Sequence, residues 1–254
     1  FTGFDMKLAH VEAGLRSYDR TMPEEINRVI ADHLSDYLFA PTCKARDIAV
    51  SEGVDRKKVW ITGNTIVDAV YESLEHSRVC SDILERKRLK KGQYILLTLH
   101  RQENVDDRKR VFNMIKGIKK TAKKLGLPVV FPIHPRTVAK FGSFGIDPHG
   151  FSDVTEPVGF LDFISLEASA ALVLTDSGGL QEEACILKVP CVTLRDTTER
   201  PETVEVGANL LAGACPERIL KCAEKMISRK KEWKNPFGEG DSAKRIINIL
   251  NKMK

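Results

Sequence analysis

The 254-residue sequence lacks the features that define several protein classes. It has no run of about 18 apolar residues, so no transmembrane helix is predicted. No secretory signal peptide is evident, although the chain opens at Phe1 and not at a methionine. The six cysteines form no C-x-x-C pair and no Cys/His spacing typical of zinc. This pattern predicts reduced thiols, no metal site and a cytoplasmic location.

Charge and aromatic content argue against a nucleic-acid partner. Aromatic residues make up 7% of the chain, and the formal net charge of +5 is spread along it. The densest basic runs fall in or beside expected helices, which indicates solvated helix faces. A nucleic-acid surface would cluster basic residues with aromatic ones. The mild positive balance is better suited to a small anionic ligand.

Short apolar runs alternate with amphipathic stretches of helical length, a pattern typical of an α/β fold with a parallel sheet. The expected strands are 8–11, 37–40, 59–61, 94–99, 129–132, 172–175 and 191–194. The expected helices are 23–33, 42–52, 66–75, 107–125, 163–170, 179–186, 216–228 and 243–253.

The segment 77–92 is polar, highly charged and without a strand pattern, so it predicts a linker between two domains. Only three strands are expected before it, too few for a self-contained doubly wound domain. We therefore expect residues 1–76 to be the rear part of one domain. Residues 93–235 hold a coherent series of strand and helix pairs and are expected to form a complete domain.

A Ser-Gly-Gly turn between a buried strand and a helix is the strongest local pattern. Ser177, Gly178 and Gly179 follow the strand 172–175. Glycines allow close approach of a phosphate to the free N–H groups and positive dipole end of a helix. Glu183, one turn further on, would repel phosphate, so we expect it to bind ribose hydroxyls. The alternative is an ordinary helix start with a serine N-cap.

Polar loops follow three other strands. Their notable residues are His100, Arg101, His134, Arg136, Arg195, Thr198, Glu199 and Arg200. Ligands in open α/β sheets bind at the carboxyl ends of the strands, so the loops together favour a site there. A solvated loop would explain each of them singly.

Two carboxylates near the N-terminus could act as acid and base. Glu12 lies just beyond an expected strand, and Glu24 lies at a helix start. His10 and Glu12 could also be metal ligands. Third and fourth ligands at a usual spacing are missing from the sequence, so we predict no metal there.

A series of sequence blocks resembles the non-hydrolysing UDP-N-acetylglucosamine 2-epimerase family. The blocks are HVEAGLRS at 10–17, PEEINR at 23–28, TGNTIVDA at 62–69, LTLHRQEN at 97–104, EPVGFLDF at 156–163, TDSGGLQEEA at 175–184, RDTTERPETVEVGAN at 195–209 and FGEGDSAKRI at 237–246. The resemblance implies a GT-B architecture of two Rossmann-like domains. The N-terminal domain would be incomplete here, and residues 236–254 would form a C-terminal helix that packs back toward it.

The resemblance implies an isomerase that interconverts UDP-N-acetylglucosamine and UDP-N-acetylmannosamine. The reaction would eliminate UDP in the anti sense to give a 2-acetamidoglucal and then add UDP back. We expect no cofactor and no nucleic-acid or membrane partner. We expect a homodimer, which is usual in this family. The alternatives are a hydrolysing epimerase that releases N-acetylmannosamine and UDP, a GT-B glycosyltransferase, and an inactive UDP-binding fragment.

The resemblance also assigns site residues by motif. The catalytic residues would be Glu12, Glu24 and His100. The substrate-binding residues would be Arg28, Ser177, Gly178 and Gly179 at the diphosphate, Glu183 at the ribose and Phe163 at the uracil. The cleft residues of uncertain role are His10, Arg16, Arg101, His134, Arg136, Arg195, Thr198, Glu199 and Arg200. Arg136 stands where the family more often has asparagine, which leaves its role and that of His134 open.

Overall fold

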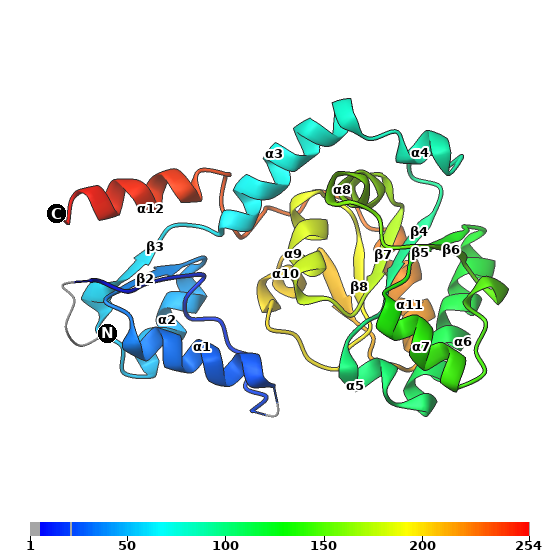
Figure 1. Ribbon diagram of the computed structural model, residues 1–254, viewed down its shortest axis with the longest axis horizontal. Helices are drawn as coiled ribbons and strands as arrows, with labels where there is room; N and C mark the ends of the chain where they lie inside the picture. Colours follow the sequence, from blue (N-terminus) through cyan, green and yellow to red (C-terminus); the bar gives the residue numbers. More distant parts are fainter. Residues whose placement is uncertain (1–5, 21, 254) are drawn as a thin grey trace. The chain divides into compact units, whose positions relative to one another are not determined.

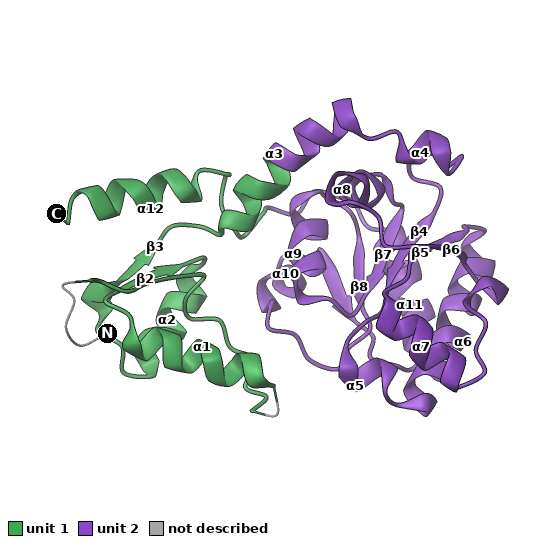
Figure 2. Ribbon diagram, in the orientation of Figure 1, with its two compact units in different colours: residues 1–71, 235–254 green, residues 72–234 purple. Residues whose placement is uncertain are grey.

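The computed structural model describes residues 6–20 and 22–253. They form two compact units, each built on its own parallel sheet (Figure 1). Unit 1 contains the described residues up to Tyr71 and those from Asn235 onward, whereas unit 2 is Glu72–Lys234 (Figure 2). The C-terminal segment therefore belongs to the same unit as the N-terminal segment.

Unit 1 has a three-stranded sheet in the order β1-β2-β3. Its strands are β1 (Ala9–Val11), β2 (Tyr37–Ala40) and β3 (Val59–Ile61), all parallel. The helices are α1 (Pro23–Leu34), α2 (Cys43–Ser51), the first part of α3 (Thr65–Cys80) and α12 (Ser242–Asn251). Helix α1 begins with a proline, whose fixed φ suits the first helical turn. A small core of leucine, valine and alanine joins β2 and β3 to α2.

Helix α12 is attached to unit 1 by hydrogen bonds between residues that lie 174 and 175 positions apart in the sequence. The Asp68 carboxylate accepts from the backbone N–H groups of Ser242 and Ala243, both at 3.2 Å. A carboxylate at a helix N-terminus satisfies donors that have no partner within the helix. Gly63, at φ +83°, lies against the same segment, and a Cβ there would meet the Ser242 hydroxyl at 2.6 Å. Specific hydrogen bonds and close packing thus hold the C-terminal segment in unit 1.

Unit 2 has a six-stranded parallel sheet in the order β6-β5-β4-β7-β8-β9. The strands are β4 (Ile95–Thr98), β5 (Val129–Pro132), β6 (Asp153–Thr155), β7 (Leu172–Thr175), β8 (Cys191–Thr193) and β9 (Asn209–Leu211). The winding direction reverses between β4 and β7, which are neighbours in the sheet but not in the sequence. This doubly wound order leaves a crevice at the carboxyl ends of β4 and β7.

Helices cover both faces of this sheet. The longest of them, α6 (Arg108–Leu125), packs against α11 (Pro216–Ile227) over the larger core cluster. Helices α8 (Phe160–Ser169) and α9 (Gly178–Ile186) contribute to a second cluster. The shorter helices of the unit are α4 (Ile83–Arg86), α5 (Gln102–Val105), α7 (Pro135–Ser143) and α10 (Pro201–Glu205). No helix in the described part of the chain is long and apolar enough to cross a membrane.

The segment 77–92, expected as a linker, differs from that expectation. It holds the end of α3 and all of α4, and the boundary of the units falls earlier, within α3. It is also packed on unit 2, because Ile83 is buried and the Asp162 carboxylate accepts from Ser81 at 2.6 Å and Arg86 at 2.5 Å. Its charged side chains make helix-surface ion pairs, so its polarity reflects a surface and not an irregular connection.

Candidate active site

A buried carboxylate, Asp176, organises the ends of β4 and β7. It accepts hydrogen bonds from the backbone N–H groups of His100, at 3.1 Å, and Arg101, at 3.0 Å. The His100 ring also faces it, with Nδ1 3.3 Å from Oδ1. Just before these loops, the hydroxyls of Thr98 and Thr175 are 2.6 Å apart. The loop predicted from the strand pattern is therefore fixed by an acid that the sequence pattern did not single out.

Asn104 extends this cluster to a third strand. Its buried amide donates to Asp176 at 3.2 Å and to the carbonyl of Leu194, directly after β8, at 2.9 Å. Its amide oxygen accepts from Arg110 at 3.1 Å. The carboxyl ends of β4, β7 and β8 are thus joined by one hydrogen-bonded group. Asn104 was also missed from sequence, and the available signal was a buried polar residue inside a motif after a strand.

Burial shifts the proton affinities of this pair in opposite directions. Burial lowers the pKa of the His100 imidazole, although the neighbouring Asp176 charge opposes that change. Burial also raises the pKa of the Asp176 carboxyl, against the effect of His100 and the donors to it. A neutral ring with its proton on Nδ1, toward Asp176, presents Nε2 as a hydrogen-bond acceptor.

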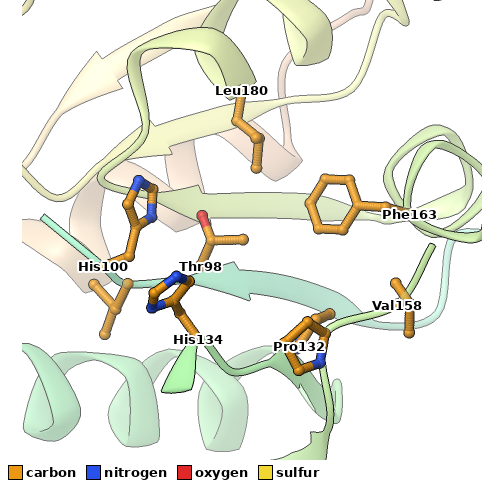
Figure 3. Close-up of a pocket in the computed structure, with 9 residues that line it drawn as sticks. Thr98, His100, Pro132, His134, Val158, Phe163 and Leu180 are labelled. Carbon is orange, nitrogen blue, oxygen red and sulfur yellow. The ribbon is translucent and has the colours of Figure 1, made fainter. Parts of the chain in front are cut away.

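His100 lines a pocket of about 230 Å³ that lies wholly within unit 2. Figure 3 shows His100 and His134 at one end of it and Phe163, Val158 and Pro132 at the other. The ring centroids of the two histidines are 6.5 Å apart. An apolar wall with a few polar groups at one end is typical of a pocket for a small organic ligand.

Arg136 lies outside this pocket. It is exposed and pairs with Asp106 at 3.0 Å. His134 is the N-cap residue of α7, and its Nδ1 accepts from the backbone N–H of Arg136 at 3.2 Å. The structure therefore brings His134 to the site but gives Arg136 a surface partner.

The Ser-Gly-Gly turn follows β7 directly and begins α9. Ser177 occupies the N-cap position, but its side chain makes no capping hydrogen bond. Its backbone N–H donates to the Thr175 hydroxyl at 2.9 Å. Ser177 is thus the N-cap residue by position, as the alternative expected, but it lacks the side-chain hydrogen bond of an ordinary serine cap. A Cβ at Gly178 would lie 2.3 Å from Oε1 of Glu199, whereas at Gly179 the nearest atom, Oε1 of Glu183, is 3.9 Å away. Gly178 thus permits close packing, and Gly179 leaves open space.

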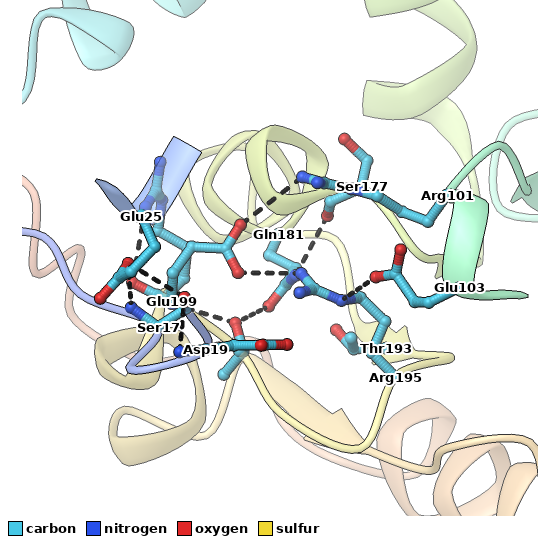
Figure 4. A network of polar contacts seen from close by, with 12 residues as sticks. Ser17, Asp19, Glu25, Arg101, Glu103, Ser177, Gln181, Thr193, Arg195 and Glu199 are labelled. Carbon is cyan, nitrogen blue, oxygen red and sulfur yellow. Dashed lines mark hydrogen bonds and ion pairs between the residues drawn. The ribbon is translucent and has the colours of Figure 1, made fainter. Parts of the chain in front are cut away.

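Glu199 is the buried centre of the loop after β8. Its carboxylate pairs with Arg195 at 2.8 Å and with Arg101 at 3.6 Å (Figure 4). Arg195 also pairs with Glu103 at 3.4 Å. Burial alone would raise the pKa of Glu199, but Arg195 and Arg200 hold it below its ordinary value. The carboxylate is therefore ionised and holds two arginines at the turn.

The same loop is fastened to the first turns of α9. Gln181 accepts from the Thr198 hydroxyl at 2.6 Å and donates to the carbonyl of Ser177 at 3.0 Å. Arg200 and Glu182, both buried, form an ion pair at 2.8 Å. The structure thus brings together the predicted residues of the turn and of the loop 195–200. Gln181 and Glu182 are partners that the sequence did not assign.

Unit 1 has a polar cluster of its own, centred on Asp32 in α1. The fully buried Asp32 carboxylate lies 2.6 Å from His10 Nδ1 and 2.7 Å from Arg16. It also accepts from the backbone N–H of Gly14 at 3.1 Å, and Arg16 pairs with Glu52 at 2.6 Å. Burial opposes the change, but hydrogen bonds from His10 and Arg16 lower the pKa of Asp32. Asp32 was missed because no motif marks one carboxylate on a helix as buried.

Glu12 lies at the end of β1 in an unusual backbone conformation. Its φ of +69° is in the left-handed region, which costs a residue other than glycine roughly 1–2 kcal/mol. Backbone strain of this kind concentrates at functional sites. Its side chain is half-buried and accepts from the amide of Asn64 at 3.5 Å.

Glu24 and Glu25 differ although both lie in the first turn of α1. Glu24 is exposed, whereas Glu25 is buried and accepts from the backbone N–H groups of Ser17 and Tyr18, each at 2.9 Å (Figure 4). Arg28 pairs with Glu25 at 3.4 Å. Although burial opposes it, these hydrogen bonds lower the pKa of Glu25. Of the two adjacent carboxylates, the structure makes Glu25 a fixed part of the loop and leaves Glu24 accessible.

Within residues 6–20 and 22–253, no group of three or more His, Cys, Asp or Glu side chains is arranged to hold a metal ion. The reversed sheet and the cluster at its crevice define a doubly wound α/β protein with a candidate ligand site at the switch point.

Comparison with known proteins identifies the family. The model of the UDP-N-acetylglucosamine 2-epimerase family matches residues 3–251. A UDP-N-acetylglucosamine 2-epimerase of Methanococcus maripaludis is 50% identical over 253 residues, covering 96% of this chain and 69% of that protein. The chain belongs to this family.

Two other relatives define the range of the similarity. The crystal structure of the Methanocaldococcus jannaschii UDP-GlcNAc 2-epimerase, in complex with UDP-GlcNAc and UDP, matches at a TM-score of 0.90 and 50% identity, covering 96% of this chain and 68% of that chain. A UDP-2,3-diacetamido-2,3-dideoxy-D-glucuronate 2-epimerase of Pseudomonas aeruginosa is 39% identical, over 97% of this chain and 68% of that protein. The predicted GT-B-type α/β fold with parallel sheets in two units is confirmed.

Proposed function

We propose that this protein takes part in the interconversion of UDP-N-acetylglucosamine and UDP-N-acetylmannosamine as a non-hydrolysing 2-epimerase. The observation that carries the proposal is the Ser177–Gly179 turn, with its uncapped helix start and the Glu183 carboxyl beside it. The relatives with 50% identity that are named for this activity support the choice of substrate.

The nucleotide would bind in unit 2. The diphosphate would lie at the N-terminus of α9, where backbone N–H groups and the Ser177 hydroxyl can donate. Glu183 would accept from the ribose hydroxyls, and the apolar end of the pocket beside Phe163 would take the uracil. His100, which lines the same pocket, would approach the diphosphate.

The chemistry requires removal of a weakly acidic proton from C2 of the sugar. A carboxylate base, Glu12 or Glu24, would take the proton as the C2–H electrons form a C1=C2 double bond. The C1–O bond would break with its electrons leaving on UDP. Positive groups such as Arg28 would stabilise the departing diphosphate. Addition of the same UDP to the 2-acetamidoglucal, with a proton delivered to the other face of C2, would complete the epimerisation without loss of the sugar.

Nuclear magnetic resonance of UDP-N-acetylglucosamine incubated with the protein in D₂O tests this proposal. We expect the UDP-N-acetylmannosamine signals to appear with deuterium at C2, because the proton is exchanged in the intermediate. Free N-acetylmannosamine and UDP would identify the hydrolysing alternative. The control is a parallel incubation with UDP-2,3-diacetamido-2,3-dideoxy-D-glucuronate, the sugar nucleotide for which the P. aeruginosa relative is named.

A UDP-binding chain without epimerase activity is the second candidate. It is favoured by the placement of the Ser177–Gly179 turn, Glu183 and the Phe163 pocket within unit 2 alone. Isothermal titration with UDP, read together with the conversion assay, separates the two candidates, because the proposed nucleotide contacts other than Arg28 lie within unit 2. Binding without conversion would support this second candidate, and absence of UDP binding would contradict both. A homodimer and a cytoplasmic location stay predictions.

A further inference from the structure

Two glutamates of neighbouring helices meet inside unit 2. Glu167 lies in α8 with none of its surface exposed, and Glu183 lies in α9 with 9% exposed. Their sequence neighbours Leu166 and Ala184 belong to the apolar cluster between these helices and the sheet. The two carboxyl groups interact with each other, and the buried Glu167 oxygens have no donor group as a partner among the described residues. A carboxyl pair in such apolar surroundings needs a physical explanation.

A hydrogen bond between two carboxyl groups requires a proton on one of them. Among the described residues, neither oxygen of Glu167 receives a hydrogen bond from an N–H group or a hydroxyl. Burial and the Glu183 charge raise the pKa of Glu167 well above its ordinary value, and burial raises that of Glu183 as well. A buried carboxylate without donors is strongly disfavoured. Burial and mutual repulsion therefore favour a proton on the pair over two buried negative charges.

The surroundings of the two groups decide where the charge lies. Glu183 Oε1 is 3.9 Å from the Cβ position of Gly179, in the first turn of α9. Negative charge is stabilised at a helix N-terminus, and Glu183 is the more exposed member of the pair. Of the two groups, Glu167 is the one whose surroundings favour the proton more strongly.

We propose that Glu167 is a positioning residue for nucleotide binding, a neutral acid that donates a hydrogen bond to Glu183 and fixes its carboxylate toward the ribose hydroxyls. The inference rests on the proposed function, which gives Glu183 its ligand. It adds a residue that lies outside the pocket and has no contact with the nucleotide.

A pair of Glu167 variants tests the donor role. Glu167→Gln keeps an N–H donor at the same place, whereas Glu167→Met keeps the volume and removes the donor. We expect UDP affinity near the wild-type value for Glu167→Gln and about tenfold weaker for Glu167→Met, because one hydrogen bond to a charged group is lost. The control ligand is 2′,3′-dideoxy-UDP, which lacks both hydroxyls and should bind the wild type and both variants equally.

A double variant distinguishes positioning from a general effect on folding. In a Glu183→Ala background, Glu167→Met should weaken UDP binding no further, because its effect acts through Glu183. An equal loss in both backgrounds, or an equal loss for the dideoxy ligand, would overturn the inference.

Infrared spectroscopy of the ligand-free protein tests the proton independently of binding. We expect the carbonyl band of a protonated carboxylic acid at neutral pH, lost in both Glu167→Gln and Glu167→Met. Its absence from the wild type, while the wild type still binds UDP, would overturn the role of Glu167 and leave the proposed function standing. Failure of the wild type to bind UDP would overturn both.

Discussion

The sheets of the two units differ in how they place polar residues. In unit 2 the winding reverses between β4 and β7, and His100, Asp176 and Ser177 lie at the carboxyl ends of these strands. The sheet of unit 1 proceeds in one direction from β1 to β3, and its polar cluster is centred on Asp32 in a helix. In unit 2 the strand order alone produces a crevice at the carboxyl ends of β4 and β7. In unit 1 the polar residues are held in place by ion pairs.

The units also differ in how much apolar surface they leave exposed. Most of the exposed large apolar side chains in the described part of the chain belong to unit 1, including Met6, Tyr18, Ile26, Ile30 and Leu34. Its core is a single small cluster, whereas unit 2 has two clusters on opposite faces of its sheet. On the proposed function, the nucleotide-binding turn lies in the unit with two core clusters, and the candidate bases Glu12 and Glu24 lie in the unit with the smaller core.

The largest expected effect is on turnover, and it tests whether unit 1 supplies the base while unit 2 binds UDP. Glu12→Gln should lower turnover by roughly 10²–10⁴-fold, because the proposed base is lost, and should leave UDP affinity unchanged. Steady-state rates and isothermal titration on the same preparation measure the two quantities. Loss of UDP binding in Glu12→Gln would contradict the division, and Glu24→Gln shows which carboxylate is the base.

Removal of the Asp176 carboxylate should destabilise unit 2 and spare unit 1. Asp176→Ala leaves buried donors of His100, Arg101 and Asn104 without their acceptor, at about 1–3 kcal/mol each. We expect a loss of about 3 kcal/mol in the free energy of unfolding.

The two tryptophans allow this to be measured unit by unit. Trp60 lies in unit 1 beside Tyr37 and Phe39, and Trp233 is buried in unit 2. Denaturant titrations followed by each tryptophan, with the other replaced by phenylalanine, should show the change at Trp233 alone. Asp153→Ala, at an exposed carboxylate, is the matched control. An equal shift at Trp60 would mean that the two units unfold as one.

A smaller effect is expected from a methyl group in the Ser-Gly-Gly turn. Gly178→Ala forces the buried Glu199 carboxylate away, since the new Cβ would lie 2.3 Å from Oε1. We expect UDP affinity to fall about tenfold as Arg101 and Arg195 lose their fixed partner. Gly159→Ala is the control, because nothing lies within 4 Å of a Cβ there. Unchanged affinity in Gly178→Ala would show that the turn does not contribute to nucleotide binding.

The smallest expected effect is that stability depends on pH with opposite sign at the key carboxyl groups of the two units. Asp32 and Glu25 have lowered pKa values, so their contribution to unit 1 is present above about pH 4 and is lost as the pH falls below it. Glu167 and Asp176 have raised pKa values, so their contribution to unit 2 decreases as the pH rises through those values. In unit 2 the lowered pKa of Glu199 acts in the opposite direction to Glu167 and Asp176, whereas Asp32 and Glu25 act together in unit 1. Acidification from pH 7 to pH 3 should therefore destabilise unit 1 before unit 2 in the same tryptophan titrations. The reverse order would contradict these assignments.

Long apolar strands and motif residues could be predicted from sequence, whereas burial of single charges could not. The runs at Ile95–Thr98 and Leu172–Thr175 predicted buried parallel strands correctly. The strands β6 and β9 were missed, because each has three residues and begins with a polar one, Asp153 or Asn209. Glu24 and Glu25 are adjacent and chemically alike, and only the path of the preceding loop decides that Glu25 is buried.

The hydrogen bonds of Asn104 also have a consequence for the folding of the chain during translation. Asn104 joins groups 72 and 90 residues further along the chain, and contacts of this separation form late because the intervening chain must first be ordered. Since a nascent chain emerges from its N-terminus, the cluster can close only after Leu194 has been released. On the proposed function, acquisition of UDP binding would therefore report the joining of β4, β7 and β8, and a fluorescent UDP analogue could time that event during translation.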